Sequence, residues 1–117
     1  MKHLACLALL VTACHAAEPP KPVSATPIPA ALDVYQACAR VWDRAVMVYA
    51  DAWAENNGVL IRNETERWAL HETFDRDLRE RGTRARFDHA CRTSITRPIY
   101  DCAMAATDAK AFGKCAP

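Results

Sequence analysis

The sequence predicts a small all-α domain, a disulfide-bonded bundle of about four helices that follows a short apolar leader and a proline-rich linker. The chain has 117 residues, which is enough for one small domain. From residue 32 onward, apolar residues recur with a helical period, and no window alternates as a strand would. Six cysteines in so short a chain indicate an oxidising compartment or a metal.

Charge and glycine content argue against several function classes. The chain carries 15 basic and 14 acidic residues, and without Lys2 of the leader the two signs balance. There is therefore no global positive charge with which to bind nucleic acid. Only three glycines are present, which disfavours a Gly-rich phosphate loop, and no cofactor is predicted.

Residues 1–13 are predicted to be a secretory leader. A short basic start, Met1-Lys2-His3, precedes an apolar run over residues 4–11. This run is too short to cross a bilayer core, which needs about 20 residues in a helix. It is typical of the core of a signal peptide.

The leader runs into Val11-Thr12-Ala13-Cys14, which resembles the lipobox of bacterial lipoprotein precursors. The resemblance implies cleavage after Ala13, lipidation of Cys14 through its sulfur, and acylation of the new amine. Several acyl chains would make the membrane anchor effectively permanent. Because His15 is not the aspartate associated with inner-membrane retention, the resemblance implies the outer membrane, facing the periplasm. The alternative is an ordinary secretory leader in which Cys14 is merely small.

Residues 14–31 are predicted to be the lipidated cysteine and a tether, and residues 32–117 the helical domain. Five of the seven prolines lie between residues 19 and 29, so this stretch cannot form a helix and is typical of a polyproline-like spacer. At about 3.1 Å per residue, the tether would reach at most about 50 Å. It is either a stalk that holds the domain off the membrane or an unstructured linker of no special length.

The first and longest helix is predicted over residues 30–57. Tyr35, Cys38, Tyr49 and Trp53 fall within 40° of Trp42 on a helical projection, and further apolar residues widen the arc. An arc this wide fits packing against two neighbouring helices rather than one. Asn56-Asn57-Gly58 is a suitable C-terminal stop.

Three shorter helices and a final turn are predicted to follow. Asn63 caps the second helix, and Thr83 caps the third, over residues 84–95, after a break at Gly82-Thr83. Pro98 lies in the first turn of the fourth helix, and Thr107-Asp108 cap a short turn that ends at Gly113. The stripe of the second helix is Leu70, Phe74 and Leu78. The inner face of the third is Phe87, Ala90, Cys91, Ser94 and Ile95.

The helical domain holds four cysteines, Cys38, Cys91, Cys102 and Cys115, which predict two disulfides. A metal site is disfavoured because the cysteines are widely spaced and no Cys-x-x-Cys occurs. An antiparallel hairpin centred near residue 60 would place Cys38 opposite Gly82, about 13 Å along a helix from Cys91. The predicted pairs are therefore Cys91–Cys102 and Cys38–Cys115. A sharp fold-back at Gly82 would instead favour Cys38–Cys91 with Cys102–Cys115.

No catalytic residue and no metal ligand is predicted, and the chain is not expected to be an enzyme. His71 and Asp75 lie four residues apart, but the second histidine of a His-Glu-x-x-His site is missing. His71 is expected to be packed or solvated, and His89 exposed. The alternative is a small cell-envelope enzyme that uses His71 or His89 with a neighbouring carboxylate.

Two features predict a binding surface. Residues 76–97 hold seven arginines against three acids, and Arg76, Arg79, Arg84 and Arg86 could contact an anionic lipid, peptidoglycan or an acidic partner. The interleaved signs favour the alternative of a solvated face paired with acidic helices. Trp68 points away from the predicted stripe, so either another helix covers it, which is favoured, or it is an exposed spot for a partner.

Anchor, tether and the lack of catalytic motifs together predict a lipid-anchored envelope module that binds a protein partner or has a structural role. A more specific version is an inhibitor or immunity-type protein that blocks a periplasmic hydrolase. A third hypothesis, a small-ligand carrier, would require an apolar cavity between the helices.

The lipobox interpretation predicts the behaviour of a Cys14→Ser variant. Without the sulfur, lipidation cannot occur, so the variant should stay unprocessed or be released in soluble form. Membrane fractionation and mass spectrometry of the N-terminus measure this. A variant that still fractionates with the membrane and matures normally would contradict the anchor.

Overall fold

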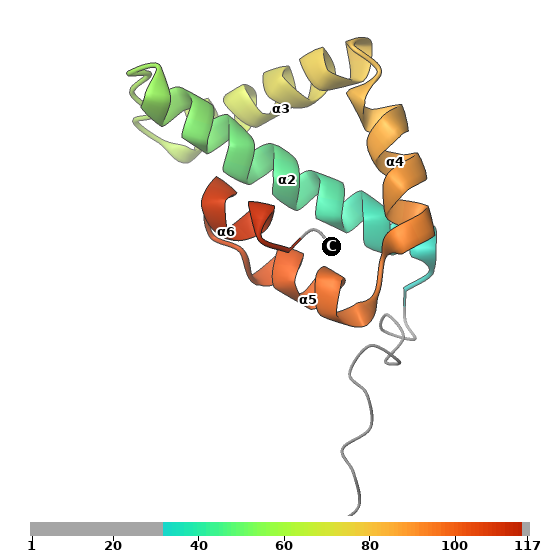
Figure 1. Cartoon of the computed structure of the whole chain (residues 1–117). Helices are drawn as coiled ribbons and strands as arrows, with labels where there is room; N and C mark the ends of the chain where they lie inside the picture. The colour runs from blue at the N-terminus through green and yellow to red at the C-terminus, as the bar shows by residue number, and fades with distance from the viewer. Residues whose placement is uncertain (1–31, 116–117) are drawn as a thin grey trace, which may run out of the picture.

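The structure, a computed structural model, describes residues 32–115, so the predicted leader, Cys14 and the tether lie outside the described residues. Within this part of the chain there are helices and no strands (Figure 1). The helices are α2 (Val34–Asn56), α3 (Glu64–Glu80), α4 (Thr83–Ser94), α5 (Arg97–Ala105) and α6 (Ala109–Gly113). The predicted all-α, disulfide-bonded class is confirmed.

Helix α2 is the central element, because it packs against each of the other four helices. Helix α2 therefore has four neighbouring helices, not the two that the width of its apolar arc predicts. The helix begins at Val34 rather than near residue 30, because Asp33 forms a capping box with Gln36. Its buried residues are Ala37, Cys38, Val41, Trp42, Ala45, Val46, Val48, Ala50 and Ala54.

The turn from α2 to α3 is fixed by backbone hydrogen bonds. Gly58 has φ of +65°, in the left-handed region, and the Val59 amide donates to the Ala54 carbonyl at 2.8 Å. Together with the bond from the Gly58 amide to the Glu55 carbonyl at 3.3 Å, this is a Schellman motif. Helix α3 then begins after Asn63, whose side chain accepts from the Glu66 amide, as predicted.

A second sharp turn separates α3 from α4. Gly82, at φ of +74°, is itself the N-cap of α4 and supplies no side chain, so the prediction that Thr83 caps this helix is wrong. From this corner α4 runs back to the N-terminal end of α2 (Figure 1). Helices α2, α3 and α4 therefore form the sides of a triangle.

The predicted disulfide pairing is wrong. The bridges are Cys38–Cys91, with a Cα–Cα distance of 5.9 Å, and Cys102–Cys115, at 5.5 Å. The expected offset of about 13 Å between Cys38 and Cys91 assumes that the chain continues straight past Gly82. Because α4 folds back at Gly82, the two cysteines instead come together. Cys91 and Cys102 do not bond to each other across a hairpin, because α4 and α5 each pack against α2.

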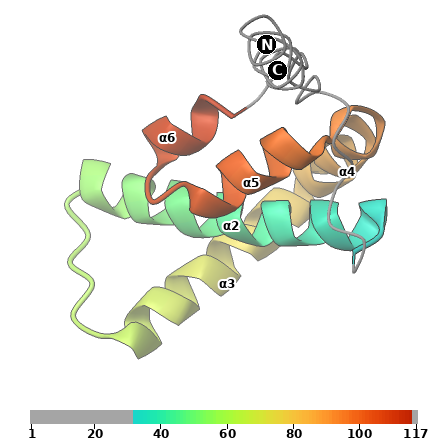
Figure 2. The ribbon, with the colours of Figure 1, turned by 90° about the horizontal axis from the view of Figure 1, so that it is seen from below.

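Helices α5 and α6 lie on the opposite side of α2 from α3 (Figure 2). Thr96 caps α5, with Pro98 in its first turn, and Asp108 caps α6 by accepting from the Ala111 amide at 2.7 Å. Tyr100 and Ala103 of α5 join Ala37 and Val41 in a buried cluster. The described N-terminal residue, Leu32, packs against this cluster.

Few side chains of α3 and α4 are fully buried. His71 is the one buried residue in α3, and α4 has none. Leu70, Phe74 and Leu78, the predicted stripe of α3, are only half-buried. So sparse a core makes the disulfides a large part of the stability of the domain.

The two bridges should contribute unequally. Cys38–Cys91 spans 53 residues and Cys102–Cys115 spans 13. In the chain-entropy model, replacing both cysteines of the long bridge with alanine lowers the free energy of unfolding by about 4 kcal/mol, and of the short bridge by about 3 kcal/mol. Urea unfolding of the two double variants measures this. Non-reducing peptide mapping that links Cys38 to Cys115 would contradict the pairing itself.

Candidate interaction surface

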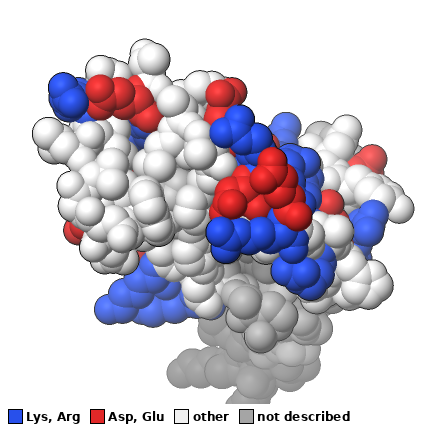
Figure 3. All heavy atoms as spheres, turned by 90° about the horizontal axis from the view of Figure 1, so that it is seen from above, with Lys and Arg blue, Asp and Glu red and all other residues white. Residues whose placement is uncertain are grey.

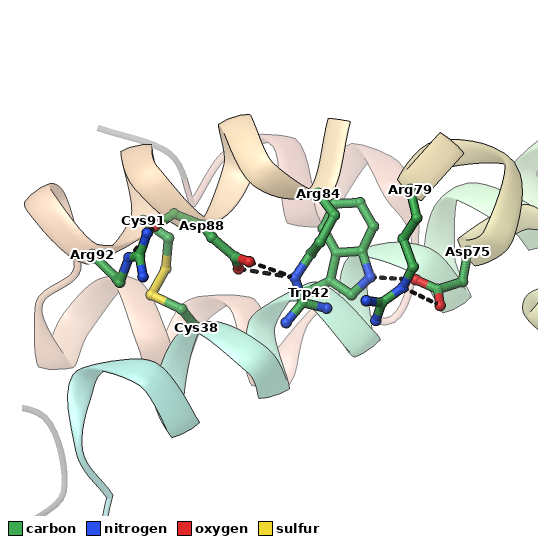
Figure 4. A network of polar contacts seen from close by, with 8 residues as sticks. All are labelled: Cys38, Trp42, Asp75, Arg79, Arg84, Asp88, Cys91 and Arg92. Atoms are coloured by element: carbon green, nitrogen blue, oxygen red, sulfur yellow. Dashed lines mark hydrogen bonds and ion pairs between the residues drawn. A yellow bond between two sulfur atoms is a disulfide. The ribbon is translucent and has the colours of Figure 1, made fainter. Parts of the chain in front are cut away.

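Trp42 joins α2 to both α3 and α4 (Figure 4). Its side chain is buried, and its indole Nε1 donates to Oδ1 of Asp75 at 2.5 Å. The other carboxylate oxygen of Asp75 accepts from Nε of Arg79 at 2.8 Å. A buried indole N–H requires an acceptor, and here Asp75 supplies it. The sequence linked Asp75 with His71, but the structure joins it to Trp42.

Asp75 is held in its ionised form. Burial alone would raise the pKa of this carboxyl group, but the hydrogen bonds from Trp42 and Arg79 and the charges of Arg79 and Arg84 outweigh it. The pKa of Asp75 therefore lies below its ordinary value of 3.8. The folded chain binds this proton more weakly than the unfolded chain does.

Helix α4 also packs against the Trp42 ring. The guanidinium of Arg84 lies 5.1 Å from the ring centroid, and the ring of Phe87 packs at 5.2 Å. Nε of Arg84 also donates to both carboxylate oxygens of Asp88 at 2.9 Å. The Arg84 side chain is only 19% exposed, so it belongs to the packing between α2 and α4.

The arginine-rich segment is largely engaged within the chain. Arg79 pairs with Asp75, Arg81 with Asp77, and Arg97 with Asp101. Arg86 donates to the Arg81 carbonyl and the Thr83 hydroxyl, whereas Arg76 is exposed without an ion pair among the described residues. Figure 3 shows basic and acidic side chains intermixed on this face. These contacts favour the alternative of a self-paired face over a free basic patch.

His71 is packed between α2 and α3, and His89 is exposed, as the sequence predicts. Nε2 of His71 lies 2.8 Å from Oδ1 of Asp51, a partner that the sequence did not indicate because it lies 20 residues away on α2. Nε of Arg67 lies 3.9 Å from the same carboxylate oxygen. Of the two histidines, His71 is the one with a carboxylate within hydrogen-bond distance among the described residues.

Exposed apolar side chains are concentrated in one stretch of the chain. Of the seven large apolar residues that are exposed, six lie between residues 47 and 68, in the second half of α2, the following loop and the start of α3. We call these six the hairpin end: Met47, Tyr49, Trp53, Val59, Leu60 and Trp68. Trp68 is 66% exposed, so the favoured expectation that another helix covers it is wrong. No other described helix reaches this side of α3.

Two shallow grooves flank Trp68, and both are lined by Met47, Trp68 and His71. One groove is bordered by three acids, Asp43, Glu72 and Asp75, and the other by Glu64 and Arg67. Asp43 and Glu72 take part in no ion pair among the described residues. Acidic side chains therefore outnumber basic ones along the grooves beside the exposed indole.

Searches with protein-family models, curated proteins and solved structures found no match to this chain. None of the described helices is long and apolar enough to cross a membrane. Within residues 32–115, no group of three or more His, Cys, Asp or Glu side chains is arranged to hold a metal ion.

The lowered pKa of Asp75 predicts a pH-dependent stability. Because the folded pKa lies below the unfolded one, the stabilisation is fully present above pH about 4 and is lost as the pH falls through the folded pKa. Asp75→Asn removes the charge, so the free energy of unfolding should drop by about 1 to 2 kcal/mol at pH 7 and change little at pH 2. Urea unfolding at both pH values measures this.

Asp77→Asn is the matched control, because Asp77 is an exposed member of an i,i+4 pair on the same helix. It should change the free energy of unfolding by no more than about 0.5 kcal/mol at either pH. A variant Asp75→Asn that keeps the parent's full pH dependence would show that Trp42 does not depend on this carboxylate.

Proposed function

We propose that the chain is a lipid-anchored module of a bacterial envelope, facing the periplasm, that binds a protein partner through the hairpin end. The observation that carries this proposal is the indole of Trp68, 66% exposed, which lines two grooves together with the exposed side chain of Met47. Scattered single apolar residues are normal on a protein surface, but an exposed tryptophan that shares a groove with a second exposed apolar side chain is typical of an interaction site.

The position of the hairpin end supports a display role. Helix α2 spans 23 residues, about 34 Å, between Leu32 at one end and the hairpin end at the other. The predicted tether joins the domain at Leu32. A partner in the periplasm would therefore meet the end of the domain that lies farthest from the attachment point.

The charges around Trp68 indicate the chemistry of the partner. Asp43 and Glu72 border the groove next to Trp68 and have no ion-pair partner among the described residues. A lysine or arginine of the partner could pair with these carboxylates and lie over the face of the indole. The best-fitting partner is a protein with a basic, partly apolar surface, and a periplasmic hydrolase blocked by an inhibitor or immunity-type protein is one version of it.

The second candidate is a small envelope enzyme, and the pair of His71 and Asp51 favours it. At 2.8 Å, Asp51 could orient His71 as a general base. The pair also ties α3 to α2 and the His71 side chain is only 9% exposed, which gives it a structural role without any chemistry. No Ser, Cys or Thr side chain is hydrogen-bonded to His71 among the described residues.

A photocrosslinking experiment tests partner binding. With p-benzoylphenylalanine in place of Trp68, irradiation of intact cells should give one main adduct of defined mass, which mass spectrometry identifies. The same residue in place of His89, exposed on α4, is the matched control and should give none. Equal adducts from both positions, or none from position 68, would contradict the proposal.

Affinity measurements with the captured partner then separate the two candidates. Trp68→Ala should weaken binding at least tenfold while changing the free energy of unfolding by no more than about 0.5 kcal/mol, because the side chain is exposed. Glu72→Lys should weaken binding more at low salt than at high salt. If His71→Gln instead abolishes turnover of an envelope substrate and leaves partner binding intact, the enzyme is the better assignment.

A further inference from the structure

A half-open apolar cavity of about 420 Å³ lies on the side of α2 that faces α5 and α6. Its walls are the inner face predicted for the third helix, namely Phe87, Ala90, Cys91, Ser94 and Ile95 of α4, and residues of α2, α5 and α6 opposite. Among the residues that the structure describes, no charged side chain lines it. The volume lies in the range of small-molecule sites, about 300 to 1,000 Å³.

Covalent bonds join the helices that line this cavity. The Cys38–Cys91 bridge fixes the last turn of α4 to α2, and the Cys102–Cys115 bridge fixes the end of α6 to α5. Cys91 and Cys115 themselves line the cavity. An edge-to-face pair of Tyr49 and Phe112, with ring centroids 5.8 Å apart, lies at the same site. The cavity is therefore preformed and does not depend on a bound molecule to open it.

The lining indicates an uncharged, apolar ligand. The polar side chains in it are the hydroxyl groups of Ser94 and Tyr49, and the Ser94 hydroxyl already donates to the Ala90 carbonyl at 2.7 Å. A charged group could not be compensated inside, whereas a hydrocarbon would replace water from the apolar walls. Any polar head of the ligand must stay at the open side of the cavity.

The place where the preceding chain enters narrows the ligand class. Leu32 packs against the same cluster as Phe87, Ile95 and Phe112, three residues that line the cavity. The cavity therefore extends from Tyr49 to the part of the domain that the predicted tether and anchor would hold near a membrane. The apolar molecules available there are lipids, and a linear acyl chain is the part of a lipid that an uncharged cavity accepts.

We propose that this cavity binds one acyl chain of a separate lipid or fatty acid molecule. The choice of an acyl chain rests on the proposed envelope anchor, but the cavity and its test do not. The chain's own anchor is not the occupant, because stable anchoring requires that its acyl chains stay in the bilayer.

Titration of the full chain carrying Cys14→Ser with cis-parinaric acid, a fluorescent linear fatty acid, tests this without a membrane. We expect saturable binding of one molecule per chain. Ala90→Trp should weaken it at least tenfold, because an indole on α4 would fill the cavity. His89→Trp, the matched control, adds the same side chain at the neighbouring position outside the lining and should leave the affinity unchanged.

Ser94→Trp is a second blocking variant and should weaken binding to the same extent. Far-UV circular dichroism establishes that each variant is folded. Absence of saturable binding to the parent chain overturns the proposal, as does undiminished binding to both folded blocking variants. Lower uptake by the lipidated wild type than by the Cys14→Ser chain would overturn the assignment to a separate molecule. Membrane fractionation tests the anchor independently, so failure of the anchor and failure of the cavity remain distinguishable.

Discussion

The burial of Trp42 is the constraint on which the arrangement of the first three helices depends. Its indole N–H must have an acceptor once it leaves water, and Asp75 of α3 supplies it. The Trp42 ring also lies under the guanidinium of Arg84 and against the ring of Phe87, both of α4. A single side chain of α2 thus fixes the positions of both other sides of the triangle, and it draws Arg79 and Arg84 into roles inside the molecule.

Such a triangle buries little apolar surface, and this explains why the disulfides are placed where they are. Helices α3 and α4 contribute one fully buried residue between them, His71. Hydrogen bonds of Trp42 and His71 hold α3 to α2, and Arg84 and Phe87 pack α4 against Trp42. At the far end of α4, the guanidinium of Arg92 lies 5.0 Å from the centroid of the Tyr35 ring. The Cys38–Cys91 bridge lies at that end and closes the triangle.

The sequence predicts local structure well and the path of the chain poorly. The caps at Asn63 and Asp108, the stop at Gly58 and the break at Gly82 follow from side-chain and backbone preferences that act over a few residues. The direction that α4 takes after Gly82 depends on Trp42, 40 positions earlier. The helical periodicity of the sequence does not predict this direction. For this reason the cysteine pairing, the burial of Arg84 and the exposure of Trp68 differ from expectation.

The central position of α2 gives the domain two different apolar surfaces. On the side of α5 and α6, the disulfides link helices around a cavity with no charged side chain among its described lining residues. Beyond its contacts with Trp42 and His71, α2 continues to the hairpin end, where α3 has already diverged and nothing among the described residues covers Trp68. Acids border the second surface and are absent from the first. Charge therefore separates the two: the cavity selects an uncharged hydrocarbon, whereas the hairpin end selects a partner that brings positive charge together with apolar area.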